Sequence, residues 1–195
     1  MAMKSKLNIV ISGVGGQGIV TLARIIGEAA VKNDVKVMVA ETHGLSQRGG
    51  SVEVHVRLGN VYAPLVPKGE ADVLLSMELI ESARNIDYLN KDGIVISSDV
   101  ILRPPIPGVK LPKKEEIINE FEKNNIKYYL IPTKELAEKV GSYQSENMIL
   151  LGALYKLSEI SKFISVDAIK DSIKTMRNPE INIRAFELGN SLWIF

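Results

Sequence analysis

Short apolar runs along the chain alternate with longer stretches in which apolar residues recur at helical spacing. Residues 7–12 are apolar enough for a buried strand, and residues 17–32 follow with helical periodicity. The turn residues Asn33 and Asp34 then lead into a second apolar run over 35–40. This β-α-β order predicts an α/β domain in which helices connect parallel strands.

Residues 51–58 depart from this pattern because they alternate strictly between apolar and polar side chains. Valines and Leu58 share one face, and Ser51, Glu53, His55 and Arg57 share the other. Such alternation predicts a half-exposed strand that runs antiparallel to its neighbour. We therefore expect a single domain over 1–195 with a three-layer Rossmann-like α/β fold and a mostly parallel sheet that includes antiparallel pairing.

The remaining elements follow from the same periodicities. We expect strands over 71–76, 94–97 and 128–131, and helices over 77–90, 113–125, 133–140 and 180–188 and from Glu146 and Ser165 onward. Thr133, Ser145 and Ser165 are predicted N-caps. The helix from Glu146 is apolar nearly all round, so it should be covered on every side. A row formed by Glu78, Glu81 and Arg84 is interpreted as exposed ion pairs on a helix surface.

Composition narrows the classes of function. Lys and Arg number 24 against 23 Asp and Glu, which argues against a nucleic-acid-binding surface. No apolar run approaches the length of a membrane span, and the first residues lack the apolar core of a signal peptide, so we predict a cytoplasmic protein without membrane contact. The sequence has no cysteine, which excludes disulfides, thiolate-bound zinc, cysteine-ligated iron–sulfur clusters and a cysteine nucleophile.

A glycine-rich turn joins the first predicted strand to the first predicted helix. Residues 13–18 match G-x-G-x-x-G in the strand-turn-helix context that this motif requires. Glycines there allow backbone N–H groups to approach a bound anion. The predicted cofactor-binding residues of the turn are Gly13, Gly15, Gly16, Gln17 and Gly18. Ile19 and Val20 follow, so the turn lacks the Lys-Ser/Thr pair of a P-loop, and ATP hydrolysis is not expected.

A second polar stretch runs from Glu41 to Ser51. Glu41 ends the second predicted strand 23 positions after Gly18, where dinucleotide-binding domains keep a ribose-binding carboxylate. Arg48 stands beside two glycines, so it can clamp a carboxylate or phosphate or else anchor its own loop. The two histidines are twelve positions apart without a carboxylate at ligand spacing, which favours structural roles and predicts no metal site.

Four stretches together resemble the small γ-type subunit of 2-oxoacid:ferredoxin oxidoreductases. They are residues 13–18, residues 41–52, the 71–81 segment that ends in Glu78-Leu79-Ile80-Glu81, and residues 147–153. The resemblance covers nearly the whole chain and ends near Gly189. The run from His43 to Val52 favours the indolepyruvate branch, whose small subunit is the β subunit, over the 2-oxoglutarate and pyruvate branches.

The resemblance implies an oxidative decarboxylation of aryl 2-oxo acids to arylacetyl-CoA with reduction of ferredoxin. Thiamine diphosphate, magnesium and [4Fe-4S] clusters would then belong to a larger α subunit, which also meets ferredoxin, while coenzyme A is a co-substrate. We expect no cofactor bound by this chain alone and no activity of the chain alone. It has no cysteine for a cluster and no Gly-Asp-Gly followed by the Asn that holds thiamine diphosphate and magnesium.

Within this family, the two polar stretches are expected to lie near the substrate. Arg48 is the candidate for a phosphate or carboxylate contact, and His43 is the candidate for a polar or proton-handling role. The predicted binding residues of the second stretch are Glu41, Ser46, Gln47, Gly49, Gly50 and Ser51. Two other hypotheses stay open: a free-standing NAD(P)- or FAD-binding protein, and a purely structural subunit whose glycines only permit close packing.

Overall fold

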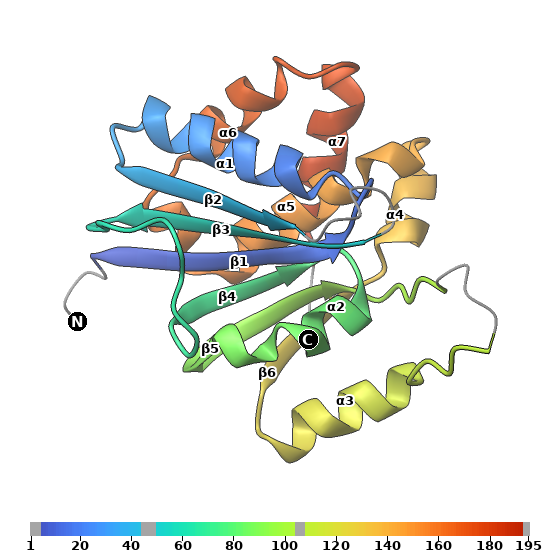
Figure 1. The fold of residues 1–195 in the computed structure, drawn as a ribbon. Coiled ribbons are helices and arrows are strands. Elements are labelled where there is room, and N and C mark those ends of the chain that lie inside the picture. Colours follow the sequence, from blue (N-terminus) through green and yellow to red (C-terminus); the bar gives the residue numbers. More distant parts are fainter. Residues whose placement is uncertain (1–4, 44–49, 104–107, 193–195) are drawn as a thin grey trace.

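A computed structural model describes residues 5–43, 50–103 and 108–192, with the side chain of His43 excepted. The described residues form one six-stranded sheet with the order β2-β3-β1-β4-β5-β6 (Figure 1). The strands are β1 Lys6–Val14, β2 Val37–His43, β3 Ser51–Gly59, β4 Ala71–Ser76, β5 Leu89–Ser98 and β6 Lys127–Ile131. β1, β4, β5 and β6 pair in parallel, and β3 is antiparallel to both of its neighbours. The predicted fold class is confirmed.

Helices cover the two faces of the sheet unequally (Figure 1). The larger layer contains α1 Ile19–Lys32, α4 Thr133–Val140, α5 Glu146–Leu157, α6 Val166–Ile173 and α7 Pro179–Asn190. The smaller layer contains α2 Leu79–Arg84 and α3 Lys114–Lys123. Short 3₁₀ turns lie at Ile86–Tyr88, Tyr143–Ser145 and Glu159–Lys162. Alternate residues of β1 supply the two cores, with Ile9 and Ile11 facing the larger layer and Val10 facing the smaller one.

The predicted apolar helix from Glu146 is α5, and it is covered as expected. Its residues from Asn147 to Leu154 are all buried. Two glycines bring it against α7: a Cβ on Gly152 would overlap the carbonyl oxygen of Phe186, and a Cβ on Gly189 would overlap that of Ile149. Gly189 therefore lies within α7 and serves as a contact point between helices.

The expectation of a half-exposed β3 is wrong, although its antiparallel pairing is confirmed. His55 and Arg57 are only 1% and 8% exposed. The connection from β3 to β4 folds back over this face, where Arg57 donates hydrogen bonds to the carbonyl oxygens of Ala63 and Leu65. The backbone N–H of Val66 donates to Nδ1 of His55. The polar face of β3 is thus covered by a loop whose backbone it binds.

The predicted helix over 77–90 is too long. α2 ends at Arg84, and β5 already begins at Leu89, five residues before the strand predicted over 94–97. Leu89 pairs with Ala71, and the register shifts before the next pair. A Cβ on Gly93 would lie 2.9 Å from the carbonyl oxygen of Ala71, so glycine allows this close approach.

One of the three predicted caps forms its side-chain hydrogen bond. The hydroxyl oxygen of Ser165 accepts a hydrogen bond from the N–H of Ala168 at the start of α6. Ser145 occupies the N-cap position of α5, but its hydroxyl donates to Oδ1 of Asn182 instead. Thr133 is the first helical residue of α4, where Pro132 is the N-cap.

Candidate functional site

The glycine turn lies at the carboxyl end of β1 and leads directly into α1. Gly16 and Gly18 have φ angles of +103° and +77°, which L side chains rarely adopt. Val14 N–H donates to Oε1 of Gln17 across 2.7 Å, and Nε2 of Gln17 donates to the carbonyl oxygen of Met77 across 3.0 Å. Gln17 therefore braces the turn against the end of β4.

Three glycines of the turn differ in what an added side chain would meet. A Cβ on Gly13 would lie 2.7 Å from Oε1 of Gln17, and a Cβ on Gly18 would overlap the amide nitrogen of Asn147. Among the described residues, a Cβ on Gly16 would meet nothing within 4 Å. Gly13 and Gly18 thus permit packing inside the protein, whereas Gly16 leaves the backbone open toward the surroundings.

The two polar stretches singled out in the sequence meet at this turn. The N–H of Gly15 donates a hydrogen bond to the carbonyl oxygen of Gly50 across 2.9 Å, and Ser51 pairs with Val14 at the beginning of β3. A hollow of about 480 Å³ opens beside them. It is lined by Gly15, Gly16, Gly18, Ile19, Val20, Glu41 and Val52. Glu41 and Gly50 therefore lie beside the glycine turn, and their binding roles remain predictions.

Part of the second stretch lies outside the described residues. This applies to Ser46, Gln47, Arg48 and Gly49. His43 ends β2, and its side chain is also outside the description. The roles assigned to these five residues remain predictions.

The order of the strands bears on whether Glu41 can be the ribose-binding carboxylate of a dinucleotide-binding domain. In a dinucleotide-binding domain the ribose-binding carboxylate ends the strand next to the glycine-rich one. Here β3 lies between β1 and β2, and β2 continues to His43, so Glu41 does not end its strand as predicted and lies two strand positions away from β1, about 10 Å across the sheet. The sequence spacing matches the dinucleotide motif, but the strand arrangement does not.

A second hollow of about 520 Å³ opens on the other side of the turn, near the carboxyl ends of β1, β4 and β5. Strand order reverses between β1 and β4, and open α/β sheets bind ligands at such a switch point. The lining residues beyond residues 16–18 are Thr21, Met77, Val100, Leu102, Lys134, Tyr143, Gln144, Glu146, Asn147 and Met176. Lys134, Gln144, Glu146 and Asn147 were not among the predicted site residues, although Asn147 belongs to the 147–153 stretch that carries the family resemblance.

The predicted surface row of Glu78, Glu81 and Arg84 is wrong, because the two carboxylates are only 2% and 4% exposed. Glu78 accepts hydrogen bonds from the N–H groups of Glu81 and Leu102, at 2.8 and 2.9 Å. Burial raises the pKa of Glu78 above its ordinary value. Glu81 accepts from Arg84 across 3.1 Å and from the hydroxyl of Ser51. These carboxylates hold loops together at the carboxyl edge of the sheet.

A further polar network lies on the face of β3 that the connection from β3 to β4 covers. Oε1 of Glu53 contacts Nε2 of His55 at 2.8 Å and accepts from the hydroxyls of Tyr88 and Thr42 at 2.9 and 3.1 Å. The hydrogen bond from His55 is the main cause that lowers the pKa of Glu53, and it outweighs partial burial. Because Nδ1 of His55 accepts from Val66, the neutral ring carries its proton on Nε2.

Two classes of site find no support in the part of the chain that the structure describes. It contains no group of three or more His, Asp or Glu side chains that could hold a metal ion. None of its helices is both long and apolar enough to cross a membrane. The two hollows beside the glycine turn are taken as the candidate site because predicted binding residues line them, namely Gly15, Gly16, Gln17, Gly18 and Glu41.

Comparison with known proteins adds a family relationship to this geometry. Residues 8–192 match the family model "Pyruvate ferredoxin/flavodoxin oxidoreductase". Indolepyruvate oxidoreductase subunit IorB of Archaeoglobus fulgidus is 40% identical, with 94% of each chain covered. The subunit of the same name from Pyrococcus horikoshii is 41% identical, with 93% of each chain covered. A solved 2-oxoglutarate:ferredoxin oxidoreductase from Magnetococcus marinus is 23% identical with a TM-score of 0.71, and the match covers 96% of this chain and 31% of that one.

Proposed function

Because this chain belongs to the pyruvate ferredoxin/flavodoxin oxidoreductase family, we propose that it is the small subunit of an indolepyruvate:ferredoxin oxidoreductase. The complex would decarboxylate aryl 2-oxo acids oxidatively to arylacetyl-CoA and reduce ferredoxin. Relatives named as indolepyruvate oxidoreductase subunits, 40% and 41% identical over nearly their whole length, support this assignment.

The cofactors of this reaction would belong to a larger subunit. Thiamine diphosphate supplies the carbanion chemistry at the 2-oxo carbon, and iron–sulfur clusters carry single electrons to ferredoxin. The residues of this chain do not fit these groups, since the sequence has no cysteine and the described residues contain no cluster of metal ligands. We therefore assign the chain a role in shaping the site and binding substrate.

One observation carries this role: the hydrogen bond between Gly15 and Gly50, which holds the two polar stretches together at the carboxyl edge of the sheet. The open backbone at Gly16 and the carboxylate of Glu41 border the same hollow. β3 begins here at Ser51, three positions after Arg48 in the sequence. We propose that these residues cover the partner's reaction centre or receive coenzyme A, with Arg48 binding a phosphate or carboxylate and His43 handling a proton or a polar group.

Replacement of Arg48 in the complete complex tests this role. For Arg48→Ala we expect an apparent KM for coenzyme A or for the 2-oxo acid that is raised by about tenfold or more, because a charge-assisted contact is lost. Arg24→Ala is the matched control, since Arg24 is an exposed arginine paired with Glu28 on α1. Unchanged kinetics for Arg48→Ala would remove the assignment, and indolepyruvate, pyruvate and 2-oxoglutarate compared as substrates would distinguish the branches of the family.

A second candidate function is free-standing dinucleotide binding. It is favoured by one observation, the position of Glu41 in the hollow beside the glycine turn. Titration of the isolated chain with NAD(H), NADP(H) and FAD tests it. Tight binding would support the dinucleotide function, and absence of binding would favour the role as a subunit of the oxidoreductase. Loop variants that impair assembly but leave the kinetics of the assembled complex intact would instead indicate a purely structural subunit.

A further inference from the structure

The side chain of Gln17 lies between two strands at the edge of the sheet where both strands end. β1 and β4 pair in parallel as far as Ser12 and Ser76, and the N–H of Met77 still donates to the carbonyl oxygen of Ser12 across 2.9 Å. In a regular parallel ladder, a residue that donates to one residue of the neighbouring strand accepts from the residue two positions further on. A regular ladder would therefore continue with a hydrogen bond from the N–H of Val14 to the carbonyl oxygen of Met77.

Two hydrogen bonds to Gln17 stand in place of this direct one. The N–H of Val14 donates to Oε1 of Gln17 across 2.7 Å, and Nε2 of Gln17 donates to the carbonyl oxygen of Met77 across 3.0 Å. The carboxamide is thus inserted into the ladder, and it satisfies the two backbone groups that it separates. It holds the ends of β1 and β4 further apart than a direct hydrogen bond would.

Gly13 leaves the space that the inserted carboxamide occupies. A Cβ on Gly13 would lie 2.7 Å from Oε1 of Gln17 and 2.8 Å from Cδ1 of Ile19, both shorter than a van der Waals contact. A side chain at position 13 would therefore displace the carboxamide or the side chain of Ile19. The first glycine of the motif and its glutamine form one structural unit.

This unit lies between the two hollows of the candidate site. Gly15 and Gly16 line the first hollow, and Gln17 and Met77 line the second. The strand order reverses between β1 and β4, where open α/β sheets bind ligands. Because Gln17 binds Val14 on one side and Met77 on the other, it sets both the separation of the strand ends and the path of the turn that follows β1.

We propose that Gln17 is a positioning residue of the site, an inference that rests on the proposed function. It acts through the backbone of the glycine turn and the ends of β1 and β4, a role that differs from the ligand contact predicted from the motif. The oxygen and the nitrogen of its carboxamide are already bonded inside the protein, so direct binding of a ligand would compete with these bonds. A backbone that is fixed beforehand lowers the entropic cost of binding coenzyme A or a 2-oxo acid.

Gln17→Met tests this role because methionine keeps the length of the side chain but cannot replace the two hydrogen bonds. By NMR of the full chain, we expect amide hydrogen exchange at Val14 to become about tenfold faster or more, since its N–H loses its acceptor. In the complete complex, we expect the apparent KM for coenzyme A or for the 2-oxo acid to rise by about tenfold, with kcat within about threefold of the wild type. Gln17→Asn, whose carboxamide is one carbon shorter and cannot reach both strands, should change the exchange and the KM in the same directions.

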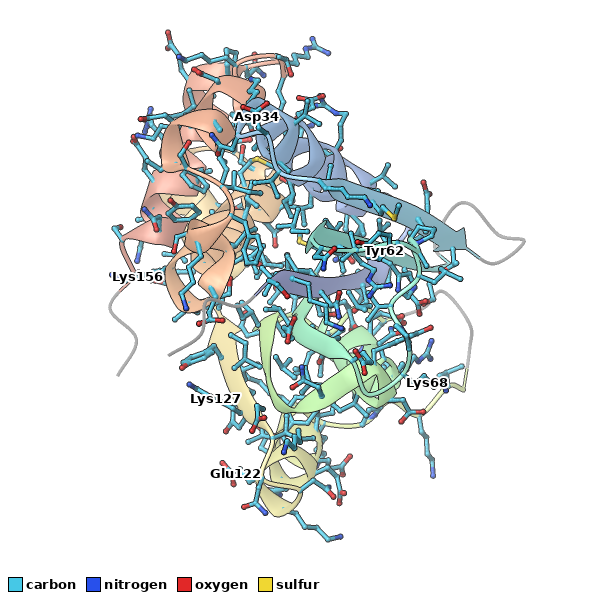
Figure 2. All side chains as sticks on the ribbon, turned by 90° about the vertical axis from the view of Figure 1, so that its left-hand side faces the viewer. Asp34, Tyr62, Lys68, Glu122, Lys127 and Lys156 are labelled. Atoms are coloured by element: carbon cyan, nitrogen blue, oxygen red, sulfur yellow. The ribbon has the colours of Figure 1, made fainter. Side chains whose placement is uncertain are left out.

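Ser165→Ala is the control for a loss of stability alone. The hydroxyl oxygen of Ser165 accepts from the N–H of Ala168 at the start of α6, so its removal weakens a helix cap. The N–H of Ser165 donates to Oδ1 of Asn33, the neighbour of Asp34. Figure 2 labels Asp34 and is seen from the edge where the parallel strands begin, opposite to the edge that carries the two hollows. The variant should unfold at a lower temperature, with the KM values and the exchange at Val14 within about twofold of the wild type.

The outcomes separate this inference from the proposed function. If the wild-type complex converts no 2-oxo acid, the proposed function fails and the inference fails with it. If the wild type is active and Gln17→Met exchanges faster at Val14 with unchanged KM values, the carboxamide serves stability alone, and only the inference is wrong. A raised KM with unchanged exchange at Val14 would show that Gln17 binds the ligand directly, which also overturns the inference.

Discussion

The hydroxyl group of Ser51 donates a hydrogen bond to Oε2 of Glu81 across 2.5 Å, which joins the first residue of β3 to α2. The other carboxylate oxygen of Glu81 accepts from Arg84. Ser51 directly follows Gly50, whose carbonyl oxygen binds the glycine turn. One buried carboxylate thus holds the beginning of β3, which follows Arg48 in the sequence.

Glu81→Gln should lower the free energy of unfolding by about 1–3 kcal/mol, because the variant loses charge-assisted hydrogen bonds at a buried carboxylate. Denaturation in urea measures the change. Glu28→Gln is the matched control, since it breaks the exposed Arg24–Glu28 pair, and it should cost less than about 1 kcal/mol. Equal costs for the two variants would show that Glu81 does not hold the beginning of β3.

Gly18→Ala should destabilise the protein more than Gly141→Ala does. Both glycines have a left-handed backbone, with φ angles of +77° and +85°, so both variants carry a strain of about 1–2 kcal/mol. A Cβ on Gly18 also overlaps the amide of Asn147, whereas a Cβ on Gly141 meets nothing within 4 Å. Thermal unfolding of both variants gives the difference. Asn147→Gly in the Gly18→Ala background should recover part of the stability, and no recovery would contradict the steric cause.

Gly152→Ala should lower the free energy of unfolding by more than about 3 kcal/mol or prevent folding, because its Cβ would overlap the backbone of α7. Gly27→Ala is the control with the opposite sign. Gly27 lies in α1, and the nearest atom to its Cβ, on Val39, is 3.8 Å away. Alanine in a helix is favoured by about 0.5–1 kcal/mol, so this variant should be more stable. Circular dichroism during heating would record both changes, and a tolerated Gly152→Ala would disprove the tight contact.

Two carboxylates whose pKa values are shifted in opposite directions, Glu53 and Glu78, should give opposite pH dependences. The pKa of Glu53 is lowered, chiefly by the hydrogen bond from His55, so its stabilisation is present above the ordinary Glu pKa and is lost as pH falls through the lowered value. The pKa of Glu78 is raised by burial, so its favourable contribution is present below the ordinary pKa and is lost as pH rises through the raised value.

Glu53→Gln and Glu78→Gln test these signs. Free energies of unfolding are measured from about pH 3 to about pH 7, where carboxylates titrate. The stability of the wild type relative to Glu53→Gln should fall as the solution becomes more acidic. Its stability relative to Glu78→Gln should rise over the same range. Curves that run parallel to the wild type for both variants would contradict the assigned causes.

The sequence predicted those parts of the fold that local pattern determines. Strand β1, the glycine turn, α1 and the fully covered α5 follow from apolar runs and helical spacing, and the strict alternation of residues 51–58 predicted antiparallel pairing. The same alternation wrongly predicted that the polar face of β3 is exposed. His55 and Arg57 are covered by the connection from β3 to β4, whose position depends on tertiary contacts. The predicted length of α2 was wrong for the same reason, because a tertiary contact, the pairing of Leu89 with Ala71, begins β5 before residue 90.

The candidate site was likewise predicted only in part. Its glycine-rich side was found because Gly15, Gly16 and Gly18 follow one another in a motif. Its other side was missed because Asn147, which donates to the carbonyl oxygen of Gly18, is 129 positions further along the chain. Neither spacing nor composition relates residues so far apart. Only folding shows that the ends of α4 and α5 line the second hollow.

The contact between Gly152 and Gly189 has a consequence for motion. Because the backbones of α5 and α7 touch, these helices cannot slide past each other and should move as one rigid body. Asn147 at the beginning of α5 contacts Gly18 in the glycine turn. If the turn moves, either both helices move with it or the contact between Asn147 and Gly18 breaks. Slow amide hydrogen exchange shared by both helices would mark them as a fixed support against which the rest of the carboxyl edge can adjust.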